Sequence, residues 1–426
     1  MIKKIISKFK TAFGFSLLRF ALLINNADLA AAAMSFVAWR IGQGEFRVLC
    51  LGRTIFVDDV KAMAKYSGKI QYLVIHLQYF ESILSYFVPP LQRKLITEAN
   101  YLTTSEGKEG RGRYYDFLTR LLPKLQARLG IQAIMSGHLS YVVQQEIITA
   151  AEKSHIPFIV LHKEALDVYG GILDTYRNYK FQGTKILFYN QKIRDELVKR
   201  ISGLGIEKTA VVGVPRLDFY FLNKRAPKSK QIAFFCFFPQ DKFLVTIKDE
   251  KKITEIKKFY ESFHGYVMDF AAKHKEFSII FKTKAAQHYF DYVYNIYREK
   301  YPSSLSNLLI TKFASTADLI VDSDAVIGFD STVLIEAIAA GRPIIRPDFR
   351  ELAIDQSWDF MNGFEELINY VKTEEDLEQV LLANKPIANP AARERFLITL
   401  IGDSSGTASS RAEQEIIGII HDKKYV

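Results

Sequence analysis

The stretch that decides the fold class is Asp324-Ala-Val-Ile-Gly-Phe-Asp-Ser-Thr-Val-Leu-Ile-Glu-Ala-Ile-Ala-Ala-Gly-Arg-Pro-Ile-Ile345. Its apolar start, Ala325–Ile327, predicts a strand, and Ser331 stands where a helix N-cap belongs. The following residues predict a helix from Thr332 to Ala340 that ends at a glycine, and then a second strand from Pro343 to Ile345. A strand, a helix and a strand in this order are typical of a parallel α/β unit.

The same alternation of strands and helices runs outward from this stretch in both directions. A polar, basic segment with a proline, Leu222–Lys230, interrupts it and predicts a linker between two domains. The expected fold class is α/β, with two Rossmann-like domains facing each other across a cleft. The expected parts are a basic amphipathic segment (1–40), an N-terminal domain (41–222), a C-terminal domain (231–388) and helices that cross back to the first domain (389–426). The other predicted strands are Phe46–Leu51, Gln71–Ile75, Gln132–Met135, Pro157–Leu161, Lys185–Tyr189, Thr209–Val212, Gln231–Phe238, Phe277–Phe281 and Leu308–Ile310.

The composition fits a folded protein with an anionic partner. Of the 426 residues, 49% are apolar and 24% charged, which allows a sizeable core. The two cysteines, Cys50 and Cys236, lie in apolar runs and provide neither a disulfide framework nor a zinc site. No Asp-x-Asp occurs at a strand end, so we expect no metal. The net charge of +10 favours an anion, which nucleic acid, a membrane surface or a phosphorylated substrate could supply.

The first twenty residues predict a basic amphipathic helix. Apolar residues recur there at helical spacing, between lysines and an arginine and without any acid. Such a helix suits an anionic lipid surface, and the alternative is a terminal helix packed on its own domain. No uninterrupted apolar run approaches the roughly 20 residues that a spanning helix needs. We expect a cytoplasmic protein that lies peripherally on the inner membrane.

The helix start at Ser331 and Thr332 predicts a phosphate site. Free backbone N–H groups at a helix start, together with two hydroxyls, form a receptor for phosphate. In a parallel sheet this position lies at the carboxyl ends of the strands, where ligands bind. Glu336 follows about one turn later, within reach of a ribose hydroxyl. The alternative is that Ser331 only caps a structural helix.

The same stretch resembles the nucleotide-binding helix of GT-B glycosyltransferases, in particular the bacterial surface carbohydrate biosynthesis group, which includes capsule-type Kdo transferases. Three further segments look like parts of that group: Leu161-His-Lys-Glu164, Val212-Gly-Val-Pro-Arg-Leu-Asp218 and Ile401-Gly-Asp-Ser-Ser-Gly-Thr-Ala-Ser-Ser-Arg411. The resemblance implies a nucleotide-sugar donor on the second domain and an acceptor on the first. The chain is also similar to teichoic-acid glycerophosphotransferases.

Two more places are candidates for binding the donor. The loop after the strand Phe277–Phe281 carries Lys282 and His288, where related enzymes often have a Lys-Pro-His-Pro run; both prolines are absent here. Gly213 and Arg216 end the last strand of the first domain and could reach a donor phosphate. The alternatives are a solvated basic loop and a plain turn.

Sugar transfer requires a carboxylate or a histidine beside the anomeric carbon. Glu164 and His138 both follow strand ends of the first domain, where side chains point toward a ligand crevice. We therefore expect Glu164, and after it His138, to be catalytic, with His162 as a neighbour that orients or protonates.

The predicted function is a metal-independent glycosyltransferase without cofactor, which moves a sugar from a nucleotide-sugar donor to a growing surface polysaccharide or lipid-linked acceptor. The alternatives are a CDP-alcohol phosphotransferase of the teichoic-acid type and a sugar-nucleotide epimerase. Nucleic-acid binding is not expected, because no basic face interleaved with aromatic residues is present and much of the positive excess lies in the termini and the linker.

Overall fold

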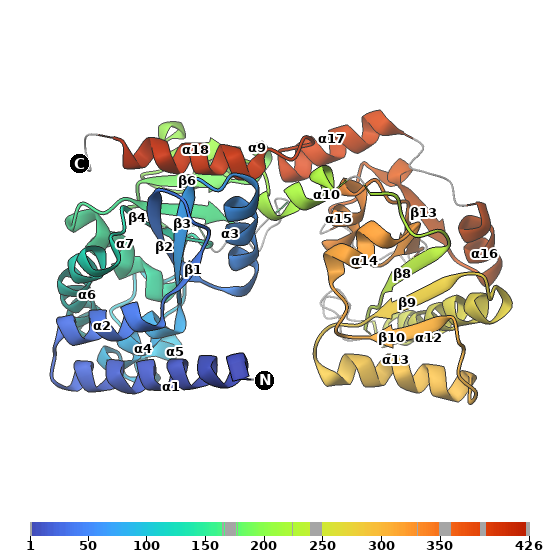
Figure 1. Cartoon of the computed structure of the whole chain (residues 1–426), viewed down its shortest axis with the longest axis horizontal. Coiled ribbons are helices and arrows are strands. Elements are labelled where there is room, and N and C mark those ends of the chain that lie inside the picture. The colour runs from blue at the N-terminus through green and yellow to red at the C-terminus, as the bar shows by residue number, and fades with distance from the viewer. Residues whose placement is uncertain are drawn as a thin grey trace. The chain divides into compact units, whose positions relative to one another are not determined.

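The computed structural model describes residues 2–163, 166, 176, 178–223, 225–238, 249–329, 331–348, 359–383 and 389–422 (Figure 1). The chain divides into two compact units. Unit 1 comprises Met1–Asp218 and Thr399–Val426, and unit 2 comprises Phe219–Ile398. The chain thus enters unit 2 just before the predicted linker and returns to unit 1 within its last helices.

Unit 1 is built on a seven-stranded sheet in the order β1-β3-β2-β4-β5-β6-β7. Strand β1 is antiparallel to β3, and the other neighbouring strands are parallel. The predicted strands of this unit are confirmed, whereas β1 was missed because three residues at a sheet edge carry little pattern. The strands are β1 (Trp39–Ile41), β2 (Phe46–Gly52), β3 (Ile70–His76), β4 (Ala133–Ser136), β5 (Phe158–His162), β6 (Lys185–Phe188) and β7 (Thr209–Val211).

Helices cover the sheet of unit 1 and share its hydrophobic core. Leu121 of α6 and Ile83 of α4 belong to the same buried cluster as Leu49 of β2. Helix α18 packs on α3. The described helices of unit 1 include α1 (Ile2–Leu23), α2 (Ala27–Val37), α3 (Thr54–Tyr66), α4 (Gln78–Phe87), α5 (Pro90–Leu95), α6 (Lys108–Leu129), α7 (Gln145–Lys153), α9 (Gln191–Arg200) and α18 (Ala408–Ile420). Helices α10 (Asp218–Leu222) and α17 (Pro390–Ile401) span the two boundaries.

Helix α1 packs on unit 1 along one of its faces. Leu18 and Leu22 are buried in the core cluster. The ring of Phe15 stacks on Tyr79 with 4.1 Å between centroids. A Cβ atom on Gly14 would lie 2.2 Å from a methyl group of Val37, so only glycine allows α1 and α2 to approach this closely. The helix is therefore an integral part of unit 1.

Unit 2 is built on a parallel six-stranded sheet in the order β10-β9-β8-β11-β12-β13. Its buried cluster includes Phe234 of β8 and Tyr260 of α12. The strands are β8 (Gln231–Phe235), β9 (Ser278–Lys282), β10 (Leu308–Thr311), β11 (Ala325–Ile327), β12 (Ile344–Pro347) and β13 (Ile368–Val371), of which only β13 was not predicted. The helices include α12 (Glu250–Lys273), α13 (Gln287–Lys300), α14 (Thr316–Asp322), α15 (Val333–Ala339) and α16 (Glu374–Ala383).

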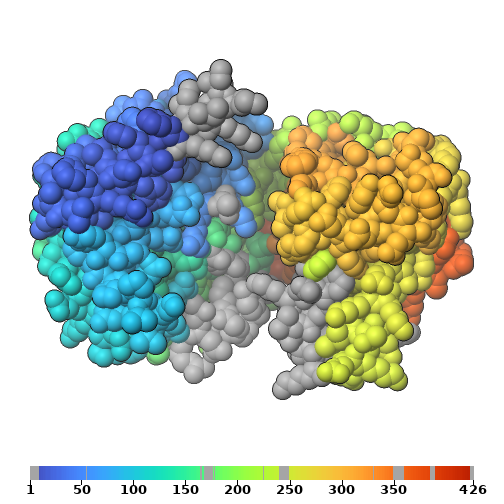
Figure 2. All heavy atoms as spheres, turned by 90° about the horizontal axis from the view of Figure 1, so that it is seen from below, coloured from blue at the N-terminus to red at the C-terminus, as the bar shows by residue number. Residues whose placement is uncertain are grey.

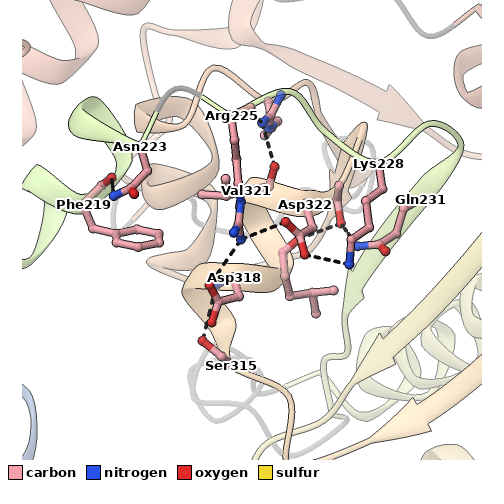
Figure 3. A network of polar contacts seen from close by, with 12 residues as sticks. Phe219, Asn223, Arg225, Lys228, Gln231, Ser315, Asp318, Val321 and Asp322 are labelled. Carbon is pink, nitrogen blue, oxygen red and sulfur yellow. Dashed lines mark hydrogen bonds and ion pairs between the residues drawn. The ribbon is translucent and has the colours of Figure 1, made fainter.

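Two basic residues of the predicted linker are paired with acids of unit 2. Arg225 lies 2.8 Å from Asp322 and 3.2 Å from Asp318 on α14, and Lys228 lies 2.9 Å from Asp322 (Figure 3). The backbone N–H of Lys228 also donates to the carbonyl of Asp322. The positive charges of Arg225 and Lys228 are therefore matched within unit 2.

Candidate functional site

The carboxyl ends of the strands of unit 2 form one edge, because all neighbouring strands of this sheet are parallel. Lys282 ends β9 at this edge. The loop between β11 and α15 starts there too, next to the end of β12, since the N–H of Gly328 donates to the carbonyl of Ile345 at 3.1 Å. Ligands of open α/β sheets bind at such an edge.

Ser331 and Thr332 lie at the start of α15, which begins at Val333, one residue later than predicted. The N-cap is Thr332, without a capping bond from its side chain, instead of the predicted Ser331. The Ser331 hydroxyl accepts only a long bond, 3.4 Å, from the N–H of Val333, and the Thr332 side chain is exposed. Both hydroxyls therefore contribute little to holding the helix.

Glu336 is held by a tyrosine that the sequence analysis missed. The hydroxyl of Tyr220, from α10, donates to Oε2 of Glu336 at 2.5 Å. Tyr220 is buried and Glu336 is half-buried. This hydrogen bond fixes the position of the Glu336 carboxylate beside the start of α15.

Lys282 and His288 lie farther from Ser331. The ammonium of Lys282 donates to the carbonyls of Thr283 and Lys312, at 2.8 and 3.2 Å, and burial lowers its pKa. His288 is exposed in the first turn of α13, with its ring 5.7 Å from that of Phe238. Strand β8 lies between β9 and β11, so two strand spacings, about 10 Å, separate Lys282 from the β11 loop.

A buried arginine at the same edge was also missed. Arg346, in β12, is only 4% exposed, and its guanidinium lies 4.9 Å from the ring centroid of Phe329. Its Nη1 lies 2.6 Å from Oδ2 of Asp359, and its Nε has no hydrogen-bond partner among the described residues. A buried N–H group without a partner is costly, and polar ligands commonly satisfy such groups. An arginine directly after two isoleucines of a predicted strand was the available signal.

Gly213 and Arg216 lie in unit 1 and have partners there. Arg216 donates through Nη1 to both carboxylate oxygens of fully buried Asp59 at 3.1 Å, and to the hydroxyl of Tyr189 at 2.9 Å. Gly213 has a φ of +85°, and a Cβ atom there would meet Ala408 at 2.9 Å. These contacts give both residues a structural role, and their binding to a donor stays a prediction.

Two segments singled out by resemblance pack on each other in unit 1. The carboxylate of Asp218 accepts from the N–H groups of Ala408 and Ser409, at 3.1 and 2.7 Å. Asp403 accepts from the N–H groups of Thr407 and Ala408, at 2.8 and 3.1 Å. Two carboxylates thus cap α18 and fasten it to the end of the first sheet.

Of the two catalytic candidates, His138 lies at the carboxyl edge of the sheet of unit 1, and Glu164 lies outside the described residues. His138 follows β4, is 6% exposed, and stacks on Tyr141 with 3.6 Å between ring centroids. Its Nδ1 accepts from the backbone N–H of Ser140 at 3.0 Å, so the neutral ring carries its proton on Nε2, which lies 3.9 Å from Glu98. Burial lowers the pKa of His138 to about 2. In this arrangement Nε2 carries the proton that the ring can donate, and the ring is a poor base.

His162 is fully buried, and burial lowers its pKa to about 3. Its Nε2 lies 3.3 Å from the hydroxyl of Tyr176. This position fits a core histidine.

A pocket of about 330 Å³ lies beside His138. Arg53 lines it, paired at 3.1 Å with Glu81 and placed 4.3 Å from the ring centroid of Tyr141. Arg93 and Glu98 complete its charged lining. The sequence analysis missed this pocket, because α5 and the loop after β4 come together only in the fold.

Comparisons with known proteins bear on the fold. No family model and no curated protein matches this sequence. The chain is similar to the solved structure of UDP-GlcNAc 2-epimerase from Methanocaldococcus jannaschii, with 10% identity, a TM-score of 0.53, and 87% of this chain and 99% of that chain covered. It is also similar to UDP-GlcNAc 2-epimerase from Neisseria meningitidis, solved bound to UDP-GlcNAc, with 12% identity, a TM-score of 0.50, and 88% and 100% covered. The chain has the GT-B fold.

The GT-B fold distributes the predicted residues over two units. Ser331, Thr332 and Glu336 lie together along α15 in unit 2, and Lys282 and His288 lie on the same side of that sheet. The remaining three described candidates, His138, Gly213 and Arg216, belong to unit 1.

Among the described residues, no three His, Cys, Asp or Glu side chains gather closely enough to hold a metal ion. None of the described helices is both long enough and apolar enough to cross a bilayer.

Proposed function

We propose that the chain is a glycosyltransferase that binds a nucleotide-sugar donor at the carboxyl edge of unit 2. The observation that carries the proposal is the loop after β11. The hydroxyls of Ser331 and Thr332 there make one long capping bond or none, and Tyr220 fixes Glu336 on the following helix, α15. The GT-B fold supports it, because this fold provides a nucleotide crevice at the carboxyl ends of parallel strands.

In the proposed complex, the hydroxyls of Ser331 and Thr332 donate to the donor phosphates and Glu336 accepts from a ribose hydroxyl. Arg346, which is ion-paired with Asp359, offers its Nε as a donor at the next strand, where this atom lacks a partner among the described residues. In the proposed complex, Lys282 and His288 reach the donor from the β9 side of β8, opposite the β11 loop. Hydrogen bonds to a charged group of this kind contribute about 1.5–3 kcal/mol each.

We place the acceptor, a growing surface polysaccharide or a lipid-linked glycan, at the pocket of unit 1. Two arginines and two glutamates give this pocket both donors and acceptors, which suits a polyhydroxylated ligand. Glu164 remains the proposed catalytic carboxylate. His138 acts beside it as a hydrogen-bond donor, as its tautomer suggests. The proposed reaction uses no metal and no cofactor.

We further propose that the reaction takes place at the cytosolic face of the inner membrane. The basic helix α1, which contains lysines and an arginine but no acid, supports an anionic lipid surface as a partner.

A thermal-shift panel of CMP, CDP, UDP and GDP tests the proposal. A ligand that binds only the folded state raises the melting temperature by mass action, by an amount equivalent to about 2.7 kcal/mol at 100 times its Kd. We expect one base to be preferred and the shift to fall by about half or more in Ser331→Ala/Thr332→Val. Stabilisation by CDP together with an activated CDP-alcohol, and by no nucleotide-sugar, would instead favour a phosphotransferase. No shift with any of the four would contradict the donor site.

A sugar-nucleotide epimerase is the second candidate. Two solved structures to which the chain is similar, at TM-scores of 0.50 and 0.53, are those of UDP-GlcNAc 2-epimerases. An epimerase changes its sugar nucleotide without any acceptor, whereas a glycosyltransferase releases nucleoside diphosphate only when an acceptor is present or, slowly, by hydrolysis. Incubation with UDP-GlcNAc alone, followed by proton NMR at C2 of the sugar, separates the two.

A further inference from the structure

The face of α1 that points away from the core of unit 1 exposes large aromatic side chains. Phe9, Phe13 and Phe20 are 69%, 48% and 52% exposed and lie on one stripe of the helix. Phe36 of α2 is 46% exposed and meets Phe13 edge to face, with 5.7 Å between ring centroids. Figure 2 views the molecule from the side of α1, where the dark-blue atoms of α1 form an open surface of unit 1. We name the surface of Phe9, Phe13, Phe20 and Phe36 the aromatic face.

The aromatic face cannot be explained by packing within unit 1. Leu18 and Leu22 of α1 already fill the core, and Phe15 already stacks on Tyr79. Helix α1 therefore has two apolar faces, one used by the core and one left open. Contiguous exposed apolar patches of this kind mark interaction sites.

The charged side chains that the structure describes on α1, Lys10 and Arg19, are both positive. The sequence of residues 1–27 contains five basic residues and no acid. The ammonium of Lys10 lies 5.2 Å from the ring centroid of Phe36, at the border of the aromatic face, and Arg19 is exposed. Aromatic rings beside cations suit the boundary of acyl chains and anionic headgroups.

We propose that the aromatic face docks unit 1 on an anionic lipid surface, with Phe9, Phe13, Phe20 and Phe36 at the boundary between headgroups and acyl chains. The sequence predicted only that α1 suits a lipid surface. From the structure we infer in addition that α1 stays packed on its domain when it binds lipid. One face stays in the core while the other meets the membrane, and α2 contributes Phe36. This inference does not depend on the nucleotide site, because lipid binding is measured without nucleotide.

Co-sedimentation of the full chain with vesicles tests the docking surface. We expect binding to vesicles of phosphatidylglycerol and phosphatidylcholine, and much weaker binding to phosphatidylcholine alone or at high salt. Phe9→Ser/Phe13→Ser should weaken vesicle binding at least about tenfold without lowering the melting temperature, since both side chains lie outside the core. Lys10→Glu should weaken only the component that depends on anionic lipid.

The matched control is Phe313→Ser, which removes a phenylalanine that is 86% exposed in unit 2. Its vesicle binding should equal that of the unchanged chain. The proposal is overturned if the unchanged chain does not bind the anionic vesicles or if the double variant binds as well as the control. It is also overturned if light scattering shows a dimer that the double variant abolishes, because the aromatic face would then join two copies. Nucleotide affinity of the same variants, measured in parallel, keeps a failure here separate from a failure of the donor site.

Discussion

The carboxyl edges of the two sheets differ in how their polar groups are satisfied. At the edge of unit 1, the side chain of Gln144 donates to the carbonyl of His138 at 2.6 Å, and Arg216 forms an ion pair with Asp59. At the edge of unit 2, Ser331 and Thr332 make weak or no capping bonds, and Arg346 keeps a buried Nε without a partner among the described residues. Polar groups that are paired inside the protein stabilise the fold, whereas unpaired ones are available to a ligand. The polar groups named at the first edge are used within the fold, whereas those named at the second edge are the ones to which the proposed function gives the donor phosphates.

The largest effect is expected from Arg216→Ala. This change leaves the fully buried carboxylate of Asp59 without its partner, and breaking a buried ion pair costs about 3–5 kcal/mol. Denaturant unfolding should show this loss, while nucleotide affinity of the folded fraction stays unchanged. Arg225→Ala is the control, because Arg225 is half exposed and its loss should cost about 1 kcal/mol or less. A stable Arg216→Ala variant that no longer binds nucleotide would reverse the comparison.

The next effect is expected from acid. Burial lowers the pKa of His138 to about 2 and that of His162 to about 3, whereas the unfolded values lie near 6.5. Between these values the unfolded chain binds protons that the folded chain excludes, so the free energy of unfolding falls as the pH falls below about 6.5. From pH 7 to 5 the loss is on the order of 2 kcal/mol per histidine.

Unfolding curves at pH 7, 6 and 5 measure this loss. His138→Gln should flatten the pH dependence by about one proton. An unchanged slope in this variant would mean that His138 is protonated in the folded state and that its assignment as a neutral donor is wrong.

A smaller effect, on binding instead of stability, is expected from Ser331→Ala/Thr332→Val. Loss of two hydroxyl donors to phosphate should reduce nucleotide affinity at least about tenfold, at 1.5–3 kcal/mol per hydrogen bond to a charged group. The melting temperature should hardly change, because these hydroxyls make one long capping hydrogen bond or none. Ser315→Ala is the control, since the Ser315 hydroxyl caps α14 at 3.3 Å and its loss should cost about 1 kcal/mol without affecting affinity. Unaltered nucleotide binding in the double variant would remove the main support for the donor site.

The smallest effect is expected from Tyr220→Phe. The variant keeps the ring but removes the hydrogen bond that the Tyr220 hydroxyl donates to Glu336. Such a bond contributes about 1 kcal/mol. Isothermal titration should show nucleotide affinity reduced about three- to tenfold, in the same direction as Glu336→Gln. Improved affinity would mean that Tyr220 competes with the nucleotide for the carboxylate.

Local patterns predicted the strands well and the partners of side chains poorly. The strands from Phe46 to Ile345 were predicted because apolar runs bounded by turn residues are local signals. Tyr220 and Glu336 are 116 residues apart in the sequence, and the residues around each of them give no local signal for their hydrogen bond. The ion pair of Arg216 with Asp59 was not predicted, because Asp59 lies in a distant helix, α3.

The sequence by itself determined the two α/β units, the strand, loop and helix around Ser331, and the basic, amphipathic character of α1. Periodicity, turn residues and charge are properties of neighbouring residues. Only the tertiary structure decided which polar groups are used up inside the fold, that Gly213 and Arg216 hold unit 1 together, that Arg346 is buried beside the β11 loop, and which face of α1 stays open. These features depend on contacts between residues distant in the sequence, and the energy of a polar or apolar side chain depends on what surrounds it.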